Sequence, residues 1–297
     1  MSAIWVWLVT GLALGGVSPA LLRVLVRRGI HPHILLLAWL TLLSATVVQI
    51  ALPGLGDVMH RCWLVLHNGQ PDRLDGIGGA LSAAMLLTAF VRAGWALRRS
   101  AAARRALRDR HLGLARILGG ARRDQGVLWL PVAEPVAYSV PGHPPLVVAS
   151  TGLRAVLDAD ALAGVLAHER AHLARRHHML VAAADAAAAG FWWLPLMRAS
   201  PALVRTLVEL DADAHAARLH GAGGLRRALQ TLRPAPVAAP ALGITSECTE
   251  LRLARLAAQA PGDTVSAMAA LGVVASLLSA VSITVLLAVT VLASCAT

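Results

Sequence analysis

The sequence predicts a mainly α-helical, multi-pass membrane protein with one cytoplasmic domain that contains a small β-sheet. Two observations support this fold class. Hydrophobic residues make up 57% of the 297-residue chain and charged residues only 14%, a balance typical of membrane proteins rather than of soluble domains. Long uncharged stretches also flank one polar segment, which is too rich in arginine to lie in a bilayer.

Four stretches are long and apolar enough to cross a bilayer as helices, since one span needs about 20 apolar residues. They cover residues 1–22, 34–53, 77–91 and 264–297. The third has the shortest apolar core, so it is either a span that continues toward Leu97 or a buried helix of a soluble domain. No positive charge precedes the first stretch, and we therefore expect a retained span and not a cleaved signal peptide.

The charges between these stretches predict the orientation in the membrane. Residues 98–124 hold nine arginines against two aspartates, and the link after the first stretch holds three arginines and no acid. Because cytoplasmic loops carry the excess of basic residues, we expect residues 98–263 in the cytoplasm and the amino terminus outside the cell membrane. Loop arginines then account for the net charge of +11, and we expect no direct binding of nucleic acid.

The chain has four predicted parts. Residues 1–97 form three transmembrane helices, 98–233 the cytoplasmic domain, 234–263 a linker with an amphipathic helix, and 264–297 the fourth transmembrane helix. The prolines and glycine of RPAPVAAPALG predict the linker, and the leucines of ECTELRLARLAAQ, with arginines between them, predict a helix on the membrane surface. The sequence allows the apolar residues 179–197 either to enter the membrane or to remain outside it.

An apolar helical run, LAGVLAHERAHLARRHH at residues 162–178, contains an unexpected group of polar side chains. His168 and His172 lie four residues apart, so on a helix begun at Asp158 their rings project from one face and can share one metal ion. Glu169 is then placed to take a proton from a water molecule bound to that ion. This HExxH pattern is typical of zinc peptidases, whereas the alternative, a solvated helix face at the membrane boundary, needs no ion.

A second acidic pair follows about forty residues later, in ELDAD. Glu209 and Asp213 are four residues apart on a helix that we expect to begin at Pro201, with Ser200 as its cap, and to end before Gly221. Catalytic zinc takes three protein ligands and keeps one position open. Glu209 can be the third ligand, and Asp213 can orient a ligand imidazole. Alone, the pair would fit a solvated acidic face, but after an HExxH the metal site is favoured.

The other histidines near these motifs have weaker assignments. We expect His177 and His178 at the protein surface. His215, on the same helix as Glu209, fits either a surface position or the stabilisation of a developing oxyanion.

Short β-prone pieces at residues 127–130, 136–140 and 146–148 precede the HExxH helix. Many peptidases bind a substrate by adding it as one more strand to a sheet edge beside the metal. The candidate edge is formed by Ala137, Tyr138, Ser139 and Val140. A plain connecting hairpin explains the same spacing equally well.

The motifs AYSVPG, VVASTGL, LDADALAGVLAHERAHLARRHH and ELDAD, in this order, resemble the membrane-embedded zinc peptidases of the BlaR/MecR antirepressor family. The more distant HtpX/Ste24 group shares the HExxH and the ExxxD. The resemblance covers most of residues 127–220 and implies a zincin-like fold for the cytoplasmic domain. It implies that one Zn²⁺ is bound by His168, His172 and Glu209, with Glu169 as the catalytic base and Asp213 as the partner of a ligand.

The resemblance implies a zinc endopeptidase that cleaves a cytoplasmic or membrane protein in regulated proteolysis and signal transduction, with a winged-helix repressor as a candidate substrate. Some family members also cut themselves, and we expect such a cut near residues 233–243.

BlaR/MecR proteins carry an extracellular penicillin-binding domain with an SxxK motif; this chain contains no lysine, so we expect it to lack that sensor. The alternatives are an HtpX/Ste24-like quality-control protease and a non-proteolytic membrane sensor or scaffold with a structural zinc. Structural zinc usually has four ligands, often including cysteine.

Overall fold

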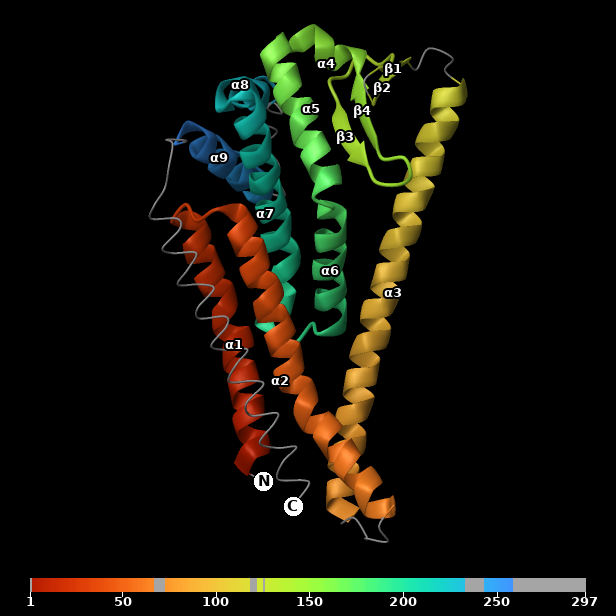
Figure 1. The fold of residues 1–297 in the computed structure, drawn as a ribbon, viewed down its shortest axis with the longest axis vertical. Helices are drawn as coiled ribbons and strands as arrows, with labels where there is room; N and C mark the ends of the chain where they lie inside the picture. Colours follow the sequence, from red (N-terminus) through yellow and green to blue (C-terminus); the bar gives the residue numbers. More distant parts are fainter. Residues whose placement is uncertain (1, 67–72, 118–121, 125, 233–242, 259–297) are drawn as a thin grey trace. The chain divides into compact units, whose positions relative to one another are not determined.

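The computed structural model describes the backbone of residues 2–66, 73–117, 122–124, 126–232 and 243–258 (Figure 1). Within these ranges the chain forms nine helices and four strands, which confirms a mainly helical protein with a small sheet. The chain separates into two compact units, Met1–Leu97 with Ala184–Leu203 and Asp263–Thr297, and Arg98–Ala183 with Val204–Gly262.

The first unit begins with helices α1 (Ser2–Arg27) and α2 (Pro32–Leu66), which pack against each other (Figure 1). Among the described residues, Val9–Arg27 and Pro32–Ala51 are the helical segments long and apolar enough to cross a membrane. The expected stretch at 77–91 belongs to α3 (Arg73–Ile117), whose side chains are described at residues 84–110 and 113. The expected stretch at 264–297 lies outside the described residues. The multi-pass topology therefore stays a prediction.

Residues 184–203 belong to the first unit and contribute to its apolar core. Phe191, Leu194 and Met197 pack there with Ile50 and Ala89. Arg92 adds a hydrogen bond from its Nε to the carbonyl oxygen of residue 189, at 2.9 Å. This apolar stretch is thus covered by α2 and α3.

The expected start of the helix that carries Glu209 was wrong. Helix α7 runs over Pro195–His220 and includes Pro201 in its interior. Ser200 does not cap it: its hydroxyl donates to the carbonyl oxygen of Leu196 at 2.7 Å and accepts from Trp39 Nε1 at 2.8 Å. Pro195 supplies the same helix-start signal earlier in the chain, and packing of the first turns against α2 keeps them helical.

The second unit contains a four-stranded sheet in the order β1-β2-β4-β3. Strands β2 and β4 are parallel and the other pairs are antiparallel. The bounds are β1 Arg122–Asp124, β2 Val127–Leu130, β3 Ala137–Val140 and β4 Leu146–Ser150. The three expected β-prone pieces are confirmed as β2, β3 and β4, whereas the arginine-rich β1 has no β-prone pattern. Among the described residues, β3 forms one edge of the sheet.

Among the described residues, seven helices contribute to the second unit, and three of them, α3, α6 and α7, belong to it only in part. Besides α3 and α7, they are α4 Thr151–Val156, α5 Ala159–Ala174, α6 His177–Gly190, α8 Ala222–Thr231 and α9 Gly243–Ala257. As expected, Asp158 caps α5, accepting a hydrogen bond from the backbone N–H of Ala161 at 2.7 Å. Helix α5 packs against the sheet on one side and α8 on another, and α9 packs against α8.

Two glycines let α5 and α8 approach closely. A Cβ atom on Gly224 of α8 would lie 2.6 Å from the carbonyl oxygen of Asp160, and one on Gly164 of α5 would lie 3.1 Å from the backbone nitrogen of Leu225. Side chains at these positions would push the two backbones apart. The tight crossing fixes α5, which carries the HExxH motif, within the second unit.

Candidate metal centre

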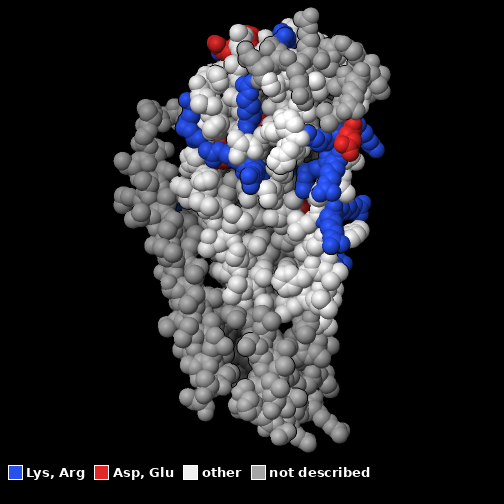
Figure 2. All heavy atoms as spheres, turned by 45° about the vertical axis from the view of Figure 1, so that its right-hand side comes forward, with Lys and Arg blue, Asp and Glu red and all other residues white. Residues whose placement is uncertain are grey.

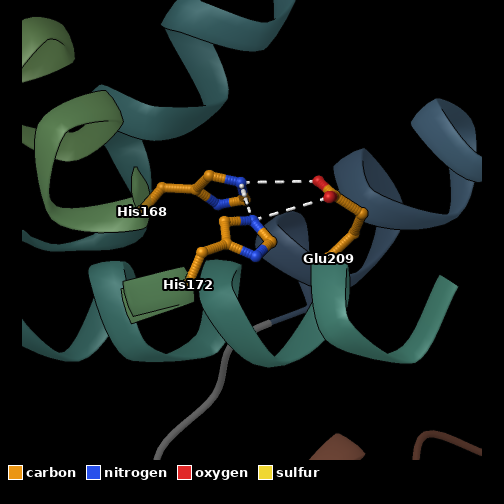
Figure 3. Close-up of side chains that lie close together, drawn as sticks. All are labelled: His168, His172 and Glu209. Atoms are coloured by element: carbon orange, nitrogen blue, oxygen red, sulfur yellow. Dashed lines mark hydrogen bonds and ion pairs between the residues drawn. The ribbon is translucent and has the colours of Figure 1, made fainter. Parts of the chain in front are cut away.

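Helices α5 and α7 bring together three side chains that could bind one metal ion. His168 and His172 lie one turn apart on α5, and their rings point toward the carboxylate of Glu209 on α7 (Figure 3). The two Nε2 atoms are 3.1 Å apart and lie 3.4 Å and 3.5 Å from the carboxylate oxygens. Among the described residues, these three form the group of side chains that could hold a metal ion.

The spacing of the donor atoms fits a tetrahedral metal ion. Ligand atoms that bind zinc at about 2.0–2.1 Å stand roughly 3.3 Å apart at the corners of a tetrahedron. The three separations here lie between 3.1 and 3.5 Å. Two imidazoles and a carboxylate are also a donor set that catalytic zinc takes, with the fourth position for water.

A buried aspartate and an arginine lie behind His168, and we call His168, Asp213 and Arg252 the aspartate brace. Nδ1 of His168 is 2.9 Å from Oδ1 of Asp213. Arg252 of α9 donates Nε and Nη2 to the two oxygens of Asp213, at 2.7 and 2.8 Å. Since Nε2 of His168 faces the metal position, its Nδ1–H can donate to Asp213, as zinc-bound histidines commonly do to a carboxylate.

Arg252 is a site residue that the sequence pattern did not reveal. The expected amphipathic helix has its arginines on the polar face, but the Arg252 side chain is only 15% exposed. Its Nη1 lies 3.1 Å from Oε2 of Glu209, so one guanidinium contacts both Glu209 and Asp213. A signal did exist: two neighbouring carboxylates, one of them buried at Asp213, need a cation close by, because unpaired buried charge is costly.

A longer chain of contacts lies behind His172, and we call His172, His177, Asp211 and Arg175 the histidine brace. Nδ1 of His172 is 2.9 Å from Nδ1 of His177, whose Nε2 is 3.0 Å from Oδ2 of Asp211. Arg175 Nη1 donates to both oxygens of Asp211, at 2.8 and 2.9 Å. If Nδ1 of His172 carries the proton, it donates to His177, and His177 donates from Nε2 to Asp211.

The expectation that His177 lies at the surface was wrong, since its side chain is only 2% exposed. On an unbroken helix, residues five apart point in directions about 140° apart. Helix α5 instead ends at Ala174, Arg176 adopts a left-handed φ of 53°, and α6 begins at His177. This break turns the His177 ring back toward His172.

The two other histidines of uncertain assignment lie away from the three converging donor atoms. His178 is half-buried and lines a cavity described below. His215 is half-buried, with Nδ1 3.4 Å from Nη2 of Arg218, and lines neither of the cavities described here.

Glu169 lines the same cavity as the three converging side chains. Burial raises the pKa of its carboxyl group above the ordinary value, although the positive charge of His168 and a hydrogen bond from Ser139 act in the opposite direction. A raised pKa brings a carboxylate closer to the pH at which a general base both stays ionised and accepts protons well.

The two histidines differ in protonation at neutral pH. Burial acts to lower the pKa of His168, but hydrogen bonds to Asp213 and Glu209 outweigh it and raise the pKa to about 9. Burial and the charge of His168 lower the pKa of His172 to about 4. For Glu209, burial is outweighed by His168 and Arg252, which bring its pKa to about 2. At neutral pH, the metal-free site thus holds one proton on His168 that metal binding must displace.

Two cavities flank the converging side chains. The first, of about 590 Å³, is bordered by β3, by the HExxH residues and by an apolar wall of α8 that includes Leu225 and Leu229. The second, of about 460 Å³, is bordered by parts of α3, α6 and α7. Both cavities are lined by Ser139, His172 and Glu209.

The candidate substrate edge coincides with β3. Ala137, Tyr138 and Ser139 line the first cavity. Val140 does not; it is 1% exposed and packs with Leu146 and Val148 on the other face of the sheet. Because β3 pairs only with β4 among the described residues, its other edge can accept a further strand.

An HExxH helix whose histidines meet a carboxylate from a second helix defines a metallopeptidase-type site. In agreement, the model of Peptidase family M48 matches residues 127–200, about a quarter of the chain. The match includes β2, β3, β4 and the whole of α5 and supports a metallopeptidase function; peptidases of this family are generally zinc-dependent. No curated protein and no solved structure matches the chain.

Proposed function

We propose that this protein is a membrane-embedded zinc endopeptidase with its active site on the cytoplasmic side. The main support is the convergence of two Nε2 atoms and the Glu209 carboxylate within 3.5 Å of one another, beside Glu169. The family match supports peptide hydrolysis, and the two long apolar helices support a place in the bilayer.

In this proposal His168, His172 and Glu209 hold one Zn²⁺, which, when bound, polarises the peptide carbonyl and acidifies water. Glu169 removes a proton from the attacking water, and the water oxygen forms a bond to the carbonyl carbon. The C–N bond then breaks, and Glu169 returns the proton to the leaving amine. Ser139 holds the Glu169 carboxylate through its hydrogen bond. A substrate that extends β3 along Ala137 to Val140 would bring its backbone past these groups.

The regulatory role is proposed from the order of motifs and the expected spans, which resemble BlaR/MecR proteins. The substrate would then be one cytoplasmic protein, such as a winged-helix repressor, cut at one site. An HtpX/Ste24-like quality-control protease is the second candidate, since the family match covers the HExxH region that both kinds of peptidase share. It predicts cleavage of many misfolded membrane proteins, so the number of substrates cut in cells separates the two roles.

Glu169→Gln tests the enzymatic proposal directly. We expect cleavage to be lost while zinc content, measured by elemental analysis of the purified full-length protein, is unchanged. Glu134→Gln is the matched control, because Glu134 is exposed. Intact masses of candidate repressors and of this chain, from cells with either variant, report cleavage. Undiminished cleavage with Glu169→Gln would contradict the proposal, and no cleavage in any strain would favour a zinc-binding scaffold.

A further inference from the structure

The second cavity has a basic lining that the proposed chemistry does not use. Arg104 of α3 and Arg205 of α7 line it, together with His178 of α6, and we call it the arginine cavity. Glu209 is the one acid among its lining residues, and its carboxylate is turned toward the two histidines. The face drawn in Figure 2 likewise carries many more basic than acidic side chains.

The two cavities differ in chemistry but share a wall. The first has an apolar wall from α8, and its charged lining residues, Glu169, Glu209 and Arg252, belong to the catalytic centre. In the arginine cavity, Arg104 and Arg205 are charged residues outside that group, and they share the lining with the apolar side chains of Leu173, Val181 and Val208. Because Ser139 and His172 line both, a peptide that crosses the site along β3 would place neighbouring side chains into two cavities, of which the second offers two arginines outside the catalytic centre.

The placement of the arginines suits an anionic group close to the metal ligands. Arg205 precedes Glu209 by four residues on α7, so both lie on the same helix face. Arg104 is half-buried and donates to Ser100, which lies one turn earlier on α3 and lines the same cavity. Two guanidinium groups that line one cavity create a positive potential, which favours an anion there. Their planar donor pairs match a carboxylate.

We propose that the arginine cavity binds a carboxylate of the substrate beside the scissile bond, so that the enzyme selects acidic peptides. This specificity rests on the proposed peptidase function. An Asp or Glu side chain and the free C-terminus of a peptide present the same group. A volume of about 460 Å³ is within the usual range for a binding pocket and is larger than one carboxylate-bearing side chain requires.

Quenched fluorescent peptides that differ by one Glu or Gln on either side of the scissile bond test the specificity. With the zinc-loaded full-length protein in nanodiscs, we expect kcat/KM at least about tenfold higher for the Glu peptide, mainly through KM. Arg104→Gln with Arg205→Gln should bring the Glu-to-Gln ratio close to one. Arg226→Gln, an exposed arginine of α8 outside both cavities, should keep the ratio. Peptides with a free or an amidated C-terminus show which carboxylate is bound.

The outcomes separate the two proposals. Equal cleavage of Glu and Gln peptides by the unaltered protein would overturn the acidic specificity and leave the peptidase proposal standing. Cleavage of neither would count against the peptidase proposal. The cavity is then judged by fluorescence anisotropy of the same peptides with the zinc-loaded Glu169→Gln protein. Tighter binding of the Glu peptide would support the arginine cavity, and equal binding would overturn it.

Discussion

His168 and His172 of the candidate metal centre are held in place by different sets of contacts. In the aspartate brace, a carboxylate directly contacts His168, and Arg252 holds that carboxylate from α9. In the histidine brace, a second imidazole stands between His172 and the aspartate–arginine pair. Both braces leave Nε2 of the histidine facing the metal position. They differ in the group that contacts the histidine and in the segments of the chain that supply their residues.

The two histidines also differ in protonation, because hydrogen bonds to Asp213 and Glu209 favour the charged form of His168, whereas burial and the charge of His168 disfavour the charged form of His172. The pKa of His168 rises to about 9, whereas that of His172 falls to about 4. The histidine brace is also local in sequence, since its residues lie between His172 and Asp211. The aspartate brace also needs Arg252, which α9 supplies from much later in the chain. The local brace can therefore form before α9 docks, and the aspartate brace cannot.

The largest expected effect comes from removing the acid of the histidine brace. Asp211→Ala leaves Arg175 and His177 without their carboxylate in the interior, where Asp211 is 1% exposed. Breaking a buried pair in this way should lower the free energy of unfolding by about 3–5 kcal/mol. Thermal unfolding of the purified protein measures this. Asp160→Ala, at a carboxylate that is 82% exposed, should leave the Tm nearly unchanged. Equal shifts for both variants would show that the buried contacts of Asp211 add no stability.

A smaller effect is expected when the intermediate imidazole is replaced. His177→Phe removes the acceptor for the Nδ1–H of His172 while it keeps an aromatic ring. Loss of such an outer contact should weaken zinc binding by about 10–100-fold. Competition with a chelator measures the affinity, and His215→Gln serves as a control outside both braces. Unchanged affinity for His177→Phe would mean that the histidine brace does not orient His172.

The unequal protonation of the two histidines predicts how many protons are released when zinc binds. At neutral pH, His168 is protonated, whereas His172 is neutral and Glu209 ionised. Zinc should therefore displace roughly one proton, and its affinity should rise about tenfold per pH unit until the pH reaches about 9. Calorimetry in buffers of different ionisation enthalpy gives the count. Asp213→Asn should reduce it, because the carboxylate that raises the pKa of His168 is gone. If zinc binding to the unaltered protein released close to no protons, the difference in protonation between His168 and His172 would be contradicted.

The smallest expected effect concerns the turn that positions His177. Arg176 has a φ of 53°, a conformation that glycine adopts without strain. Arg176→Gly should therefore change the free energy of unfolding by about 1 kcal/mol or less, in the stabilising direction. Arg176→Val should destabilise the protein. A lower Tm for the glycine variant than for the valine variant would show that the backbone at this break is not what limits stability.

Much of the site could be predicted from the sequence because its spacing is local. The four-residue separations of His168 from His172 and of Glu209 from Asp213 place each pair on one helix face. The cap at Asp158 and the bounds of β2 and β3 follow from equally short-range patterns.

The parts that could not be predicted depend on a helix break or on contacts between distant segments. His177 follows His172 by five residues, which places it on another face unless the helix ends between them. Asp211 lies two residues from both Glu209 and Asp213, and so falls off their face in the helical pattern. Arg252 reaches the site only through the packing of α9 on α8, which no local pattern encodes.

Helix α7 places Glu209, Asp211 and Asp213 within five consecutive residues, and each carboxylate has a different neighbour. One residue of helix corresponds to a turn of about 100° and a rise of about 1.5 Å. A shift of α7 by a single step would therefore disconnect all three carboxylates at once. The seating of this one helix therefore fixes the position of the proposed metal ligand and of the acids of both braces.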